Sequence, residues 1–296
     1  MPFFTRKRQP SANQLTASSA AAPLAQQRQQ AHDVISITQQ LLLPSQSQQQ
    51  PPIGTQQPQQ RPSYPWSVQR LLLPPPLVIP KPDVIAPTSP SPLPFPRYGH
   101  ALPATATVSG DLYLFGGLVR EIAYNDLYLF STRHLSATLV QTSGDIPSPR
   151  VGHASAIVSS IIIVWGGDTT FTDQSEKQDD GLYLLNIVSR EWTRIPMHGP
   201  APAGRYGHTA TMVGTKFFVF GGQADGEFLN DLWSFDLKTL RTTTVWELCQ
   251  PFGAARPAQR TGHACITYQD RIIVFGGTDG LYHYNDTWSY NTNTRT

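Results

Sequence analysis

The stretch "RYGHTATMVGTKFFVFGG", residues 205–222, decides the fold, because the chain contains four versions of it. Each version opens with Arg-x-Gly-His, and the spacings between copies are 53, 55 and 55 residues: Arg97, Arg150, Arg205 and Arg260. An apolar run and a double glycine follow in every copy, starting at Gly116, Gly166, Gly221 and Gly276. A period near 50 residues indicates an array of supersecondary units, each packed on its neighbours.

Each unit is composed of short segments typical of β-strands. In the second unit these are "ASAIV", "IIIVW", "LYLLNI" and "EWTRI", which are β-branched and aromatic and are separated by Gly, Asp and Ser. We therefore predict an all-β fold, a β-propeller with four recognisable four-stranded blades. The repeats are placed at residues 97–149, 150–204, 205–259 and 260–296, and the last blade is expected to be incomplete because the propeller is truncated at the C-terminus.

The pattern resembles the kelch repeat, in which a double glycine precedes an aromatic in the third strand and a tryptophan in the fourth. The third-strand aromatics are Tyr128, Tyr183, Trp233 and Trp288, and the fourth-strand tryptophans are Trp192 and Trp246. Upstream, "YPWSVQRL" at 64–71 and "PFPRYGHA" at 94–101 are similar to the fungal cell-end polarity markers. That resemblance implies a ring of six or seven blades and a cytoplasmic location at the cell cortex or cell tip. It also implies a role in fungal cell polarity or cortical organisation, with polarity or cytoskeletal factors as partners.

Composition divides the chain before the first repeat. Residues 1–96 hold nineteen of the 27 prolines and seventeen glutamines, but one glycine. We predict a disordered Gln/Pro-rich tail over 1–63 and a proline-rich linker that reaches residue 96. Within 64–96, residues 64–72 carry Trp66 in the context expected of a fourth strand. They are predicted to form the outer strand of the last blade and to close the ring.

Charge and motifs exclude several functions. The chain has a net charge of +2, but the repeats by themselves carry about −3, so a basic nucleic-acid face is not expected. No apolar run is long enough for a membrane span. No catalytic motif, metal site or cofactor site is predicted, and the aspartates of 168–179 are interpreted as solvated. The four histidines recur with the blade period, which the needs of the fold explain. The four arginines of the same turns are interpreted in the same way, as residues that bond blade-end carbonyls or acids. The alternative is an enzyme, a galactose-oxidase-like copper oxidase, because that enzyme shares this propeller type.

Function in a propeller is carried by loops on a rigid scaffold, which favours a non-enzymatic scaffold that binds other proteins. The loop between the second and third strands has seven residues in three units, at 118–124, 223–229 and 278–284, and twelve in the second, at 168–179. These loops are expected to share a face with the Arg-x-Gly-His turns. The residues predicted to bind a partner there are Arg120, Tyr124, Phe171, Gln174, Glu227, Phe228, Tyr282 and His283. The oligomeric state is left open.

Overall fold

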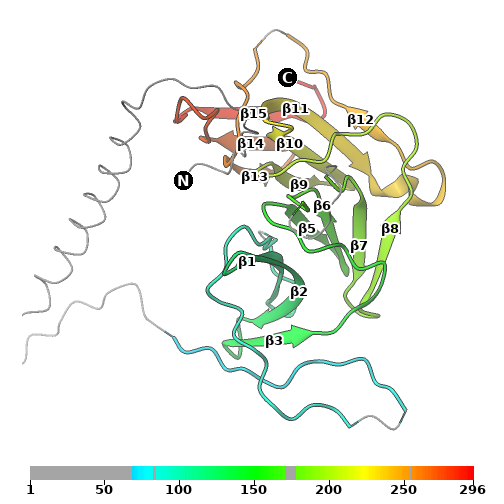
Figure 1. Cartoon of the computed structure of the whole chain (residues 1–296). Helices are drawn as coiled ribbons and strands as arrows, with labels where there is room; N and C mark the ends of the chain where they lie inside the picture. The colour runs from blue at the N-terminus through cyan, green and yellow to red at the C-terminus, as the bar shows by residue number, and fades with distance from the viewer. Residues whose placement is uncertain (1–68, 83–84, 104, 171–177, 254) are drawn as a thin grey trace, which may run out of the picture. The chain divides into compact units, whose positions relative to one another are not determined.

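A computed structural model of the chain describes residues 69–296, except 83–84, 104, 171–177 and 254. The predicted tail at 1–63 and the first part of the predicted closing strand, 64–68, lie outside the described residues. The described residues fall within one compact unit that ends at Thr296. It consists of β-sheets arranged side by side, one for each predicted repeat (Figure 1).

The first two blades contain antiparallel strands joined in chain order. The first blade holds β1 (Asp111–Val119), β2 (Ile122–Ser131) and β3 (Ser136–Val140). Its predicted innermost strand is represented by one bridge, Ala101 to Phe115. The second blade holds β5 (Ala154–Val158), β6 (Ile161–Trp165), β7 (Leu182–Asn186) and β8 (Glu191–Ile195), and the short β4 (Ser143–Gly144) pairs in parallel with β8.

The third blade has the four predicted strands and the fourth has three. The third blade holds β9 (Thr209–Val213), β10 (Lys216–Ala224), β11 (Glu227–Asp236) and β12 (Trp246–Leu248), with the 3₁₀ helix η1 (Leu237–Arg241) between the last two. The fourth holds β13 (Ala264–Tyr268), β14 (Arg271–Phe275) and β15 (Thr287–Asn291). The predicted all-β class is confirmed, whereas closure of a ring stays a prediction.

Apolar cores lie between neighbouring blades. Trp192, on the outer strand of the second blade, is 1% exposed and packs against Phe115 of the first blade with ring centroids 5.1 Å apart. Trp246 does the same one blade later, against Trp165 at 5.7 Å. The fourth-strand tryptophan of each of these blades therefore fills the space behind the preceding blade. Large aromatics bury extensive apolar surface, so these contacts hold consecutive blades together.

The double glycines allow the histidines of two blades to approach the same turn. A Cβ on Gly166 would lie 2.5 Å from Cε1 of His208 in the next blade, and a Cβ on Gly167 would lie 2.8 Å from Cβ of His153 in its own blade. Both glycines also have positive φ, +71° and +95°, a conformation that glycine adopts at little cost. The glycine pair is thus required by both packing and backbone conformation.

Each chain segment that precedes a blade returns along the outer edge of that blade. Leu72 pairs in parallel with Ser136 of β3, and Leu77 pairs with Val140. Ser91 is buried and donates both its amide and its hydroxyl to the Pro74 carbonyl. Leu77 and Ser91, which belong to the predicted proline-rich linker, therefore lie along the edge of the first blade. Leu72, the last residue of the predicted closing strand, pairs with the first blade, and a closing strand over 64–72 stays a prediction.

Candidate partner-binding face

The loops predicted at 118–124 and 223–229 are β-hairpins. Past the double glycine, β1 and β10 continue to pair with β2 and β11, after a register shift at Gly116 and Gly221. The turns are Arg120-Glu121, with φ of 48° and 69°, and Asp225-Gly226, with φ of 49° and 86°. Positive φ at both central residues is the conformation of a type I′ turn, which matches the twist of paired strands. These two blades therefore present paired hairpins where loops were predicted.

The hairpins adjoin the Arg-x-Gly-His turns, as predicted. Tyr206 bridges Gln223 and Tyr98 bridges Leu118, so each turn pairs with the chain that follows the double glycine of its blade. Glycine amides also link the turns from blade to blade through hydrogen bonds of 2.7–2.9 Å: Gly152 to Gly99, Gly207 to Gly152, and Gly262 to Gly207. This backbone ladder fixes the relative positions of the four turns and of the hairpins beside them.

A buried arginine holds each turn to the third strand of its own blade. Arg205 donates to the Gly221 carbonyl at 3.2 Å and pairs with both carboxylate oxygens of Asp231, at 2.5 and 3.0 Å. Equivalent pairs occur in the outer two blades: Arg97–Asp126 and Arg260–Asp286. The interpretation that these arginines bond blade-end carbonyls and acids is confirmed. Bidentate pairs of this kind are among the stronger hydrogen bonds in proteins.

In the second blade, Asp179 replaces the missing third-strand aspartate. Arg150 donates to its carboxylate at 2.6 Å, and the Tyr183 hydroxyl and the Gly181 amide each donate at 2.8 Å. Burial would raise the pKa of Asp179, but the Arg150 guanidinium and these donors hold it below its usual value. A Cβ on Gly181 would lie 2.9 Å from the Asp179 carboxylate, so glycine is the residue that leaves room. The interpretation of this carboxylate as solvated is wrong.

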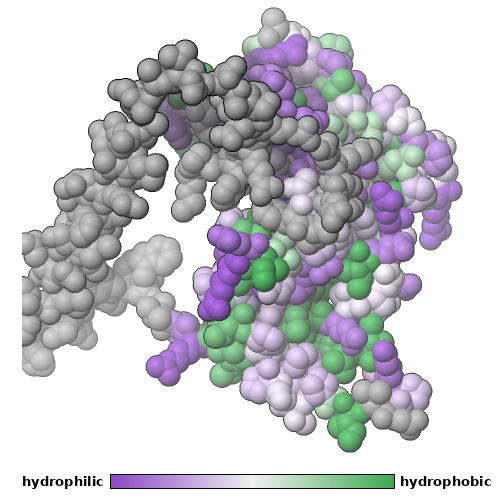
Figure 2. All heavy atoms as spheres, viewed as in Figure 1, coloured by the Kyte–Doolittle hydropathy of each residue, from purple (hydrophilic) through white to green (hydrophobic). Residues whose placement is uncertain are grey.

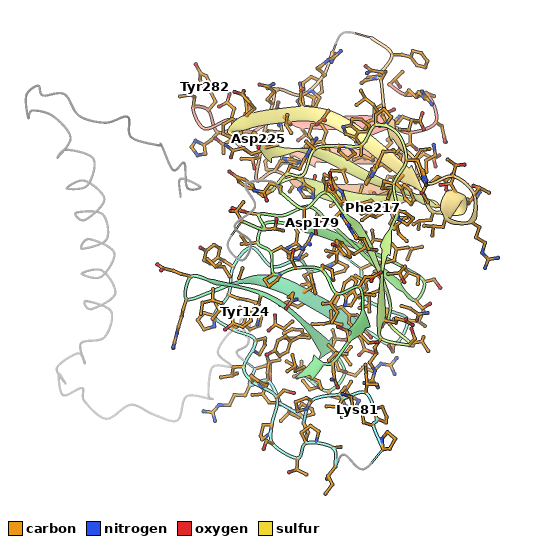
Figure 3. The ribbon with its side chains drawn as sticks, turned by 45° about the vertical axis from the view of Figure 1, so that its right-hand side comes forward. Lys81, Tyr124, Asp179, Phe217, Asp225 and Tyr282 are labelled. Atoms are coloured by element: carbon orange, nitrogen blue, oxygen red, sulfur yellow. The ribbon has the colours of Figure 1, made fainter. Side chains whose placement is uncertain are left out.

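The structure gathers most of the predicted partner-binding residues on one side of the array. Figure 3 shows Tyr124, Asp225 and Tyr282 toward the same edge, with Lys81 away from them. Tyr282 is 68% exposed, whereas Tyr124 is 37% exposed and lies beneath the Arg97 guanidinium at 5.8 Å. The other predicted residues that are described also lie here: Arg120, Glu227 and His283 are exposed and Phe228 is partly buried. Phe171 and Gln174 lie outside the described residues.

Two exposed apolar residues on the same tips were missed by the sequence analysis. Ile122 begins β2 and is 59% exposed, and Leu281 is 86% exposed. Hydrophobic side chains reach the surface over the first blade in Figure 2. An apolar residue next to a charged tip residue, as Ile122 is to Glu121, was the available signal. Exposed apolar side chains on a rigid loop are typical of contact surfaces.

The fourth-blade tip is held in shape by one carboxylate. Asp279 accepts hydrogen bonds from the amides of Leu281 and Tyr282, at 2.9 and 2.7 Å, and from the Tyr284 hydroxyl at 2.6 Å. These donors lower the pKa of Asp279 to about 2. Across the blade boundary, Phe228 packs on Gly280, with its ring 3.0 Å from where a Cβ would be. The tips of the third and fourth blades therefore form one continuous surface.

The recurring histidines lie between blades. His208 packs edge-on against Trp165 of the preceding blade at 5.0 Å, and His263 packs against Phe220 at 5.1 Å. Burial, followed by the charge of Arg205, lowers the pKa of His208 to about 3, and burial with Arg260 lowers that of His263 to about 4. These rings are therefore neutral packing groups at physiological pH. In the described ranges, no group of three His, Cys, Asp or Glu side chains is placed to hold a metal.

Comparison with known proteins identifies the family to which the array of blades belongs. A domain model described as the KLHDC2/KLHL20/DRC7 Kelch-repeats domain matches residues 99–296. The chain belongs to the kelch-repeat family. Among kelch relatives, tip elongation aberrant protein 1 of Schizosaccharomyces pombe is 40% identical over 197 residues, which is 66% of this chain and 17% of that protein.

Two further kelch relatives have similar coverage of this chain. Kelch repeat-containing protein 2 of Saccharomyces cerevisiae is 36% identical over 207 residues, 67% of this chain and 23% of that protein. Kelch domain-containing protein 3 of Homo sapiens is 30% identical over 207 residues, 67% of this chain and 52% of that protein. The chain thus spans between about a sixth and a half of the length of these relatives. Among the described residues, no helix is long and apolar enough to cross a membrane.

Proposed function

We propose that this kelch array is a non-enzymatic scaffold that binds another protein through its hairpin face. The observation that carries the proposal is the set of exposed apolar side chains on rigid tips: Ile122, Tyr124, Leu281 and Tyr282. Aromatic residues are enriched in interface cores, and a preorganised surface loses less entropy on binding. Arg120, Glu227 and His283 supply polar groups at its rim.

The partner is proposed to belong to the machinery of fungal cell polarity, at the cell cortex or cell tip. Support comes from the similarity to tip elongation aberrant protein 1, whose name refers to tip elongation, and from the upstream "YPWSVQRL" stretch. The copper-oxidase alternative has no comparable support. Both cysteines are free, and burial raises the pKa of the Cys265 thiol to about 11.

Paired substitutions on opposite ends of the blades test the proposal. Leu281→Ala with Tyr282→Ala removes the apolar tip of the fourth blade, and Val188→Ala is the matched control, since Val188 is 79% exposed on the β7–β8 turn. Each protein is used to capture partners from a fungal lysate, with quantitative mass spectrometry. A partner that is lost with the double variant and kept with the control supports the hairpin face. An identical set of captured proteins for all three would refute it.

A further inference from the structure

Charge is distributed unevenly over the repeats, and the tips of the hairpin face hold the acidic part. The four segments that follow the double glycines contain eight acidic side chains and two basic ones, a net charge of −6: 118–124, 168–179, 223–229 and 278–284. Residues 97–296 as a whole contain 18 acidic and 15 basic side chains, a net charge of −3. The remainder of the repeats is therefore net positive, and the negative charge is concentrated in these tips.

The arginines of the adjoining turns do not neutralise most of this charge. Arg97, Arg205 and Arg260 each pair with an aspartate outside the four segments, and their side chains are at most 3% exposed. Arg150 pairs with Asp179, which is therefore the tip acid that a turn arginine neutralises. Each of these arginines is used inside its own blade, so the turns leave the other tip acids with their negative charge.

The third-blade hairpin presents two of these acids. Asp225 occupies its turn, Glu227 begins β11, and both residues are exposed. None of the ion pairs among the described residues involves either carboxylate. Figure 3 shows Asp225 at the same edge of the array as Tyr282 and Tyr124. A paired hairpin therefore holds two acidic side chains at the solvent edge of the face.

The acids of the neighbouring tips continue this surface on both sides. Asp168, on the second tip, lies close enough to the third-blade turn for its charge to add to burial in raising the pKa of Tyr206. On the other side, Phe228 packs on Gly280 and joins the third tip to the fourth, which carries Asp279. The parts of these three tips that the structure describes contain no Lys or Arg: 166–170, 178–181, 221–230 and 276–285. The acidic surface therefore extends over three blades.

The fold itself shows how a carboxylate and an aromatic ring hold a basic side chain. In the fourth blade, the Arg260 guanidinium pairs with both oxygens of Asp286 and lies 4.4 Å from the centre of the Tyr284 ring. On the surface of the same blade, the exposed Tyr282 lies beside Asp279, because its amide donates to that carboxylate. A Lys or Arg of another molecule can meet the same two groups here, since a carboxylate and an aromatic face both attract a cation.

We propose that the hairpin face recognises a basic segment of its partner, in which Lys or Arg side chains flank an aromatic or aliphatic anchor. This inference rests on the proposed function of that face and names the chemistry of the segment that it binds. Charges complementary to the acidic tips speed association and suppress wrong partners, while the anchor meets the exposed Leu281 and Tyr282. The same tips repel an anionic lipid surface or a nucleic acid, since both carry negative charge. A basic protein segment is therefore the partner that fits.

Random dodecapeptides displayed on phage and selected on the 296-residue protein test this inference. We expect the selected peptides to carry more Lys and Arg than Asp and Glu and to contain an aromatic or aliphatic residue, and their affinity should fall with added NaCl. Asp225→Asn with Glu227→Gln should raise the Kd of a selected peptide on the order of tenfold, since these substitutions keep the side-chain shape and remove the charge. Glu191→Gln with Asp270→Asn, at exposed positions of the β7–β8 and β13–β14 turns, is the matched control and should leave the Kd unchanged.

The outcomes separate this inference from the proposed function. Selected peptides that are neutral or acidic, or that bind Asp225→Asn with Glu227→Gln as tightly as the unaltered protein, overturn the inference. If such peptides lose binding to Leu281→Ala with Tyr282→Ala, the face still binds a partner, but one of another chemistry. A selection that yields no peptide sensitive to either double variant overturns both. A dimer in sedimentation equilibrium that Asp225→Asn with Glu227→Gln dissociates would make a second copy the occupant and would also overturn the basic segment.

Discussion

Alanine at Gly166 is expected to destabilise the array far more than alanine at Gly276, although the two glycines are equivalent in sequence. Their φ values are +71° and +68°, so both substitutions carry the left-handed cost of about 1–2 kcal/mol. At Gly166 the new Cβ would also lie 2.5 Å from the His208 ring and 2.7 Å from the Arg205 carbonyl. At Gly276 the nearest atom, the Tyr284 carbonyl oxygen, is 3.3 Å away.

Overpacking a filled site costs about 1–3 kcal/mol, so the total expected loss is about 2–5 kcal/mol for Gly166→Ala and about 1–2 kcal/mol for Gly276→Ala. The free energy of unfolding of each variant is measured by urea denaturation. Tryptophan fluorescence reports the transition, since Trp165 lies against His208. Equal losses for the two variants would refute the account of the double glycine as a packing site for the histidine of the next blade.

Three further perturbations follow from the site. The pKa of His208 is 6.5 in the unfolded chain and about 3 in the folded protein, so the unfolded chain binds more protons and stability should fall as the pH drops from about 6.5 to about 3. His208→Gln should reduce the slope of stability against pH in acid titrations by up to about 1.4 kcal/mol per pH unit. An unchanged slope would contradict the assignment. Asp179→Ala leaves the fully buried Arg150 without its carboxylate and should cost about 3–5 kcal/mol in urea denaturation, whereas a loss below 1 kcal/mol would show that the pair is dispensable. Ser91→Ala removes the hydroxyl that bonds the Pro74 carbonyl and the Leu139 amide, so amides at the β3 edge should exchange faster with deuterium; unaltered exchange would mean that this segment is held by other contacts.

The repeat pattern was sufficient to predict the blades. The continuous apolar run "IIIVW" and the double glycine that follows it are local signals, and they place β6 and its equivalents in every copy. The pattern also indicated that the Arg-x-Gly-His arginines bond carbonyls and acids, as Arg205 does with Gly221 and Asp231. These features depend on residues within one repeat, so a single copy of the sequence contains the information.

The features that differ between copies were decided by tertiary contacts. Asp179 replaces the aspartate absent at position 181, because its side chain reaches Arg150 from two positions earlier. Leu72 pairs with Ser136 of β3, which lies far along the chain, and the proline-rich sequence around Leu72 does not predict this pair. The reason is that parallel edge pairing depends on backbone groups rather than on side-chain identity. The hairpins at Arg120 and Asp225 formed where loops were predicted, because the strands remain paired beyond the double glycine. Sequence thus determined the repeating unit, and packing between units decided which edges and tips remain available for binding.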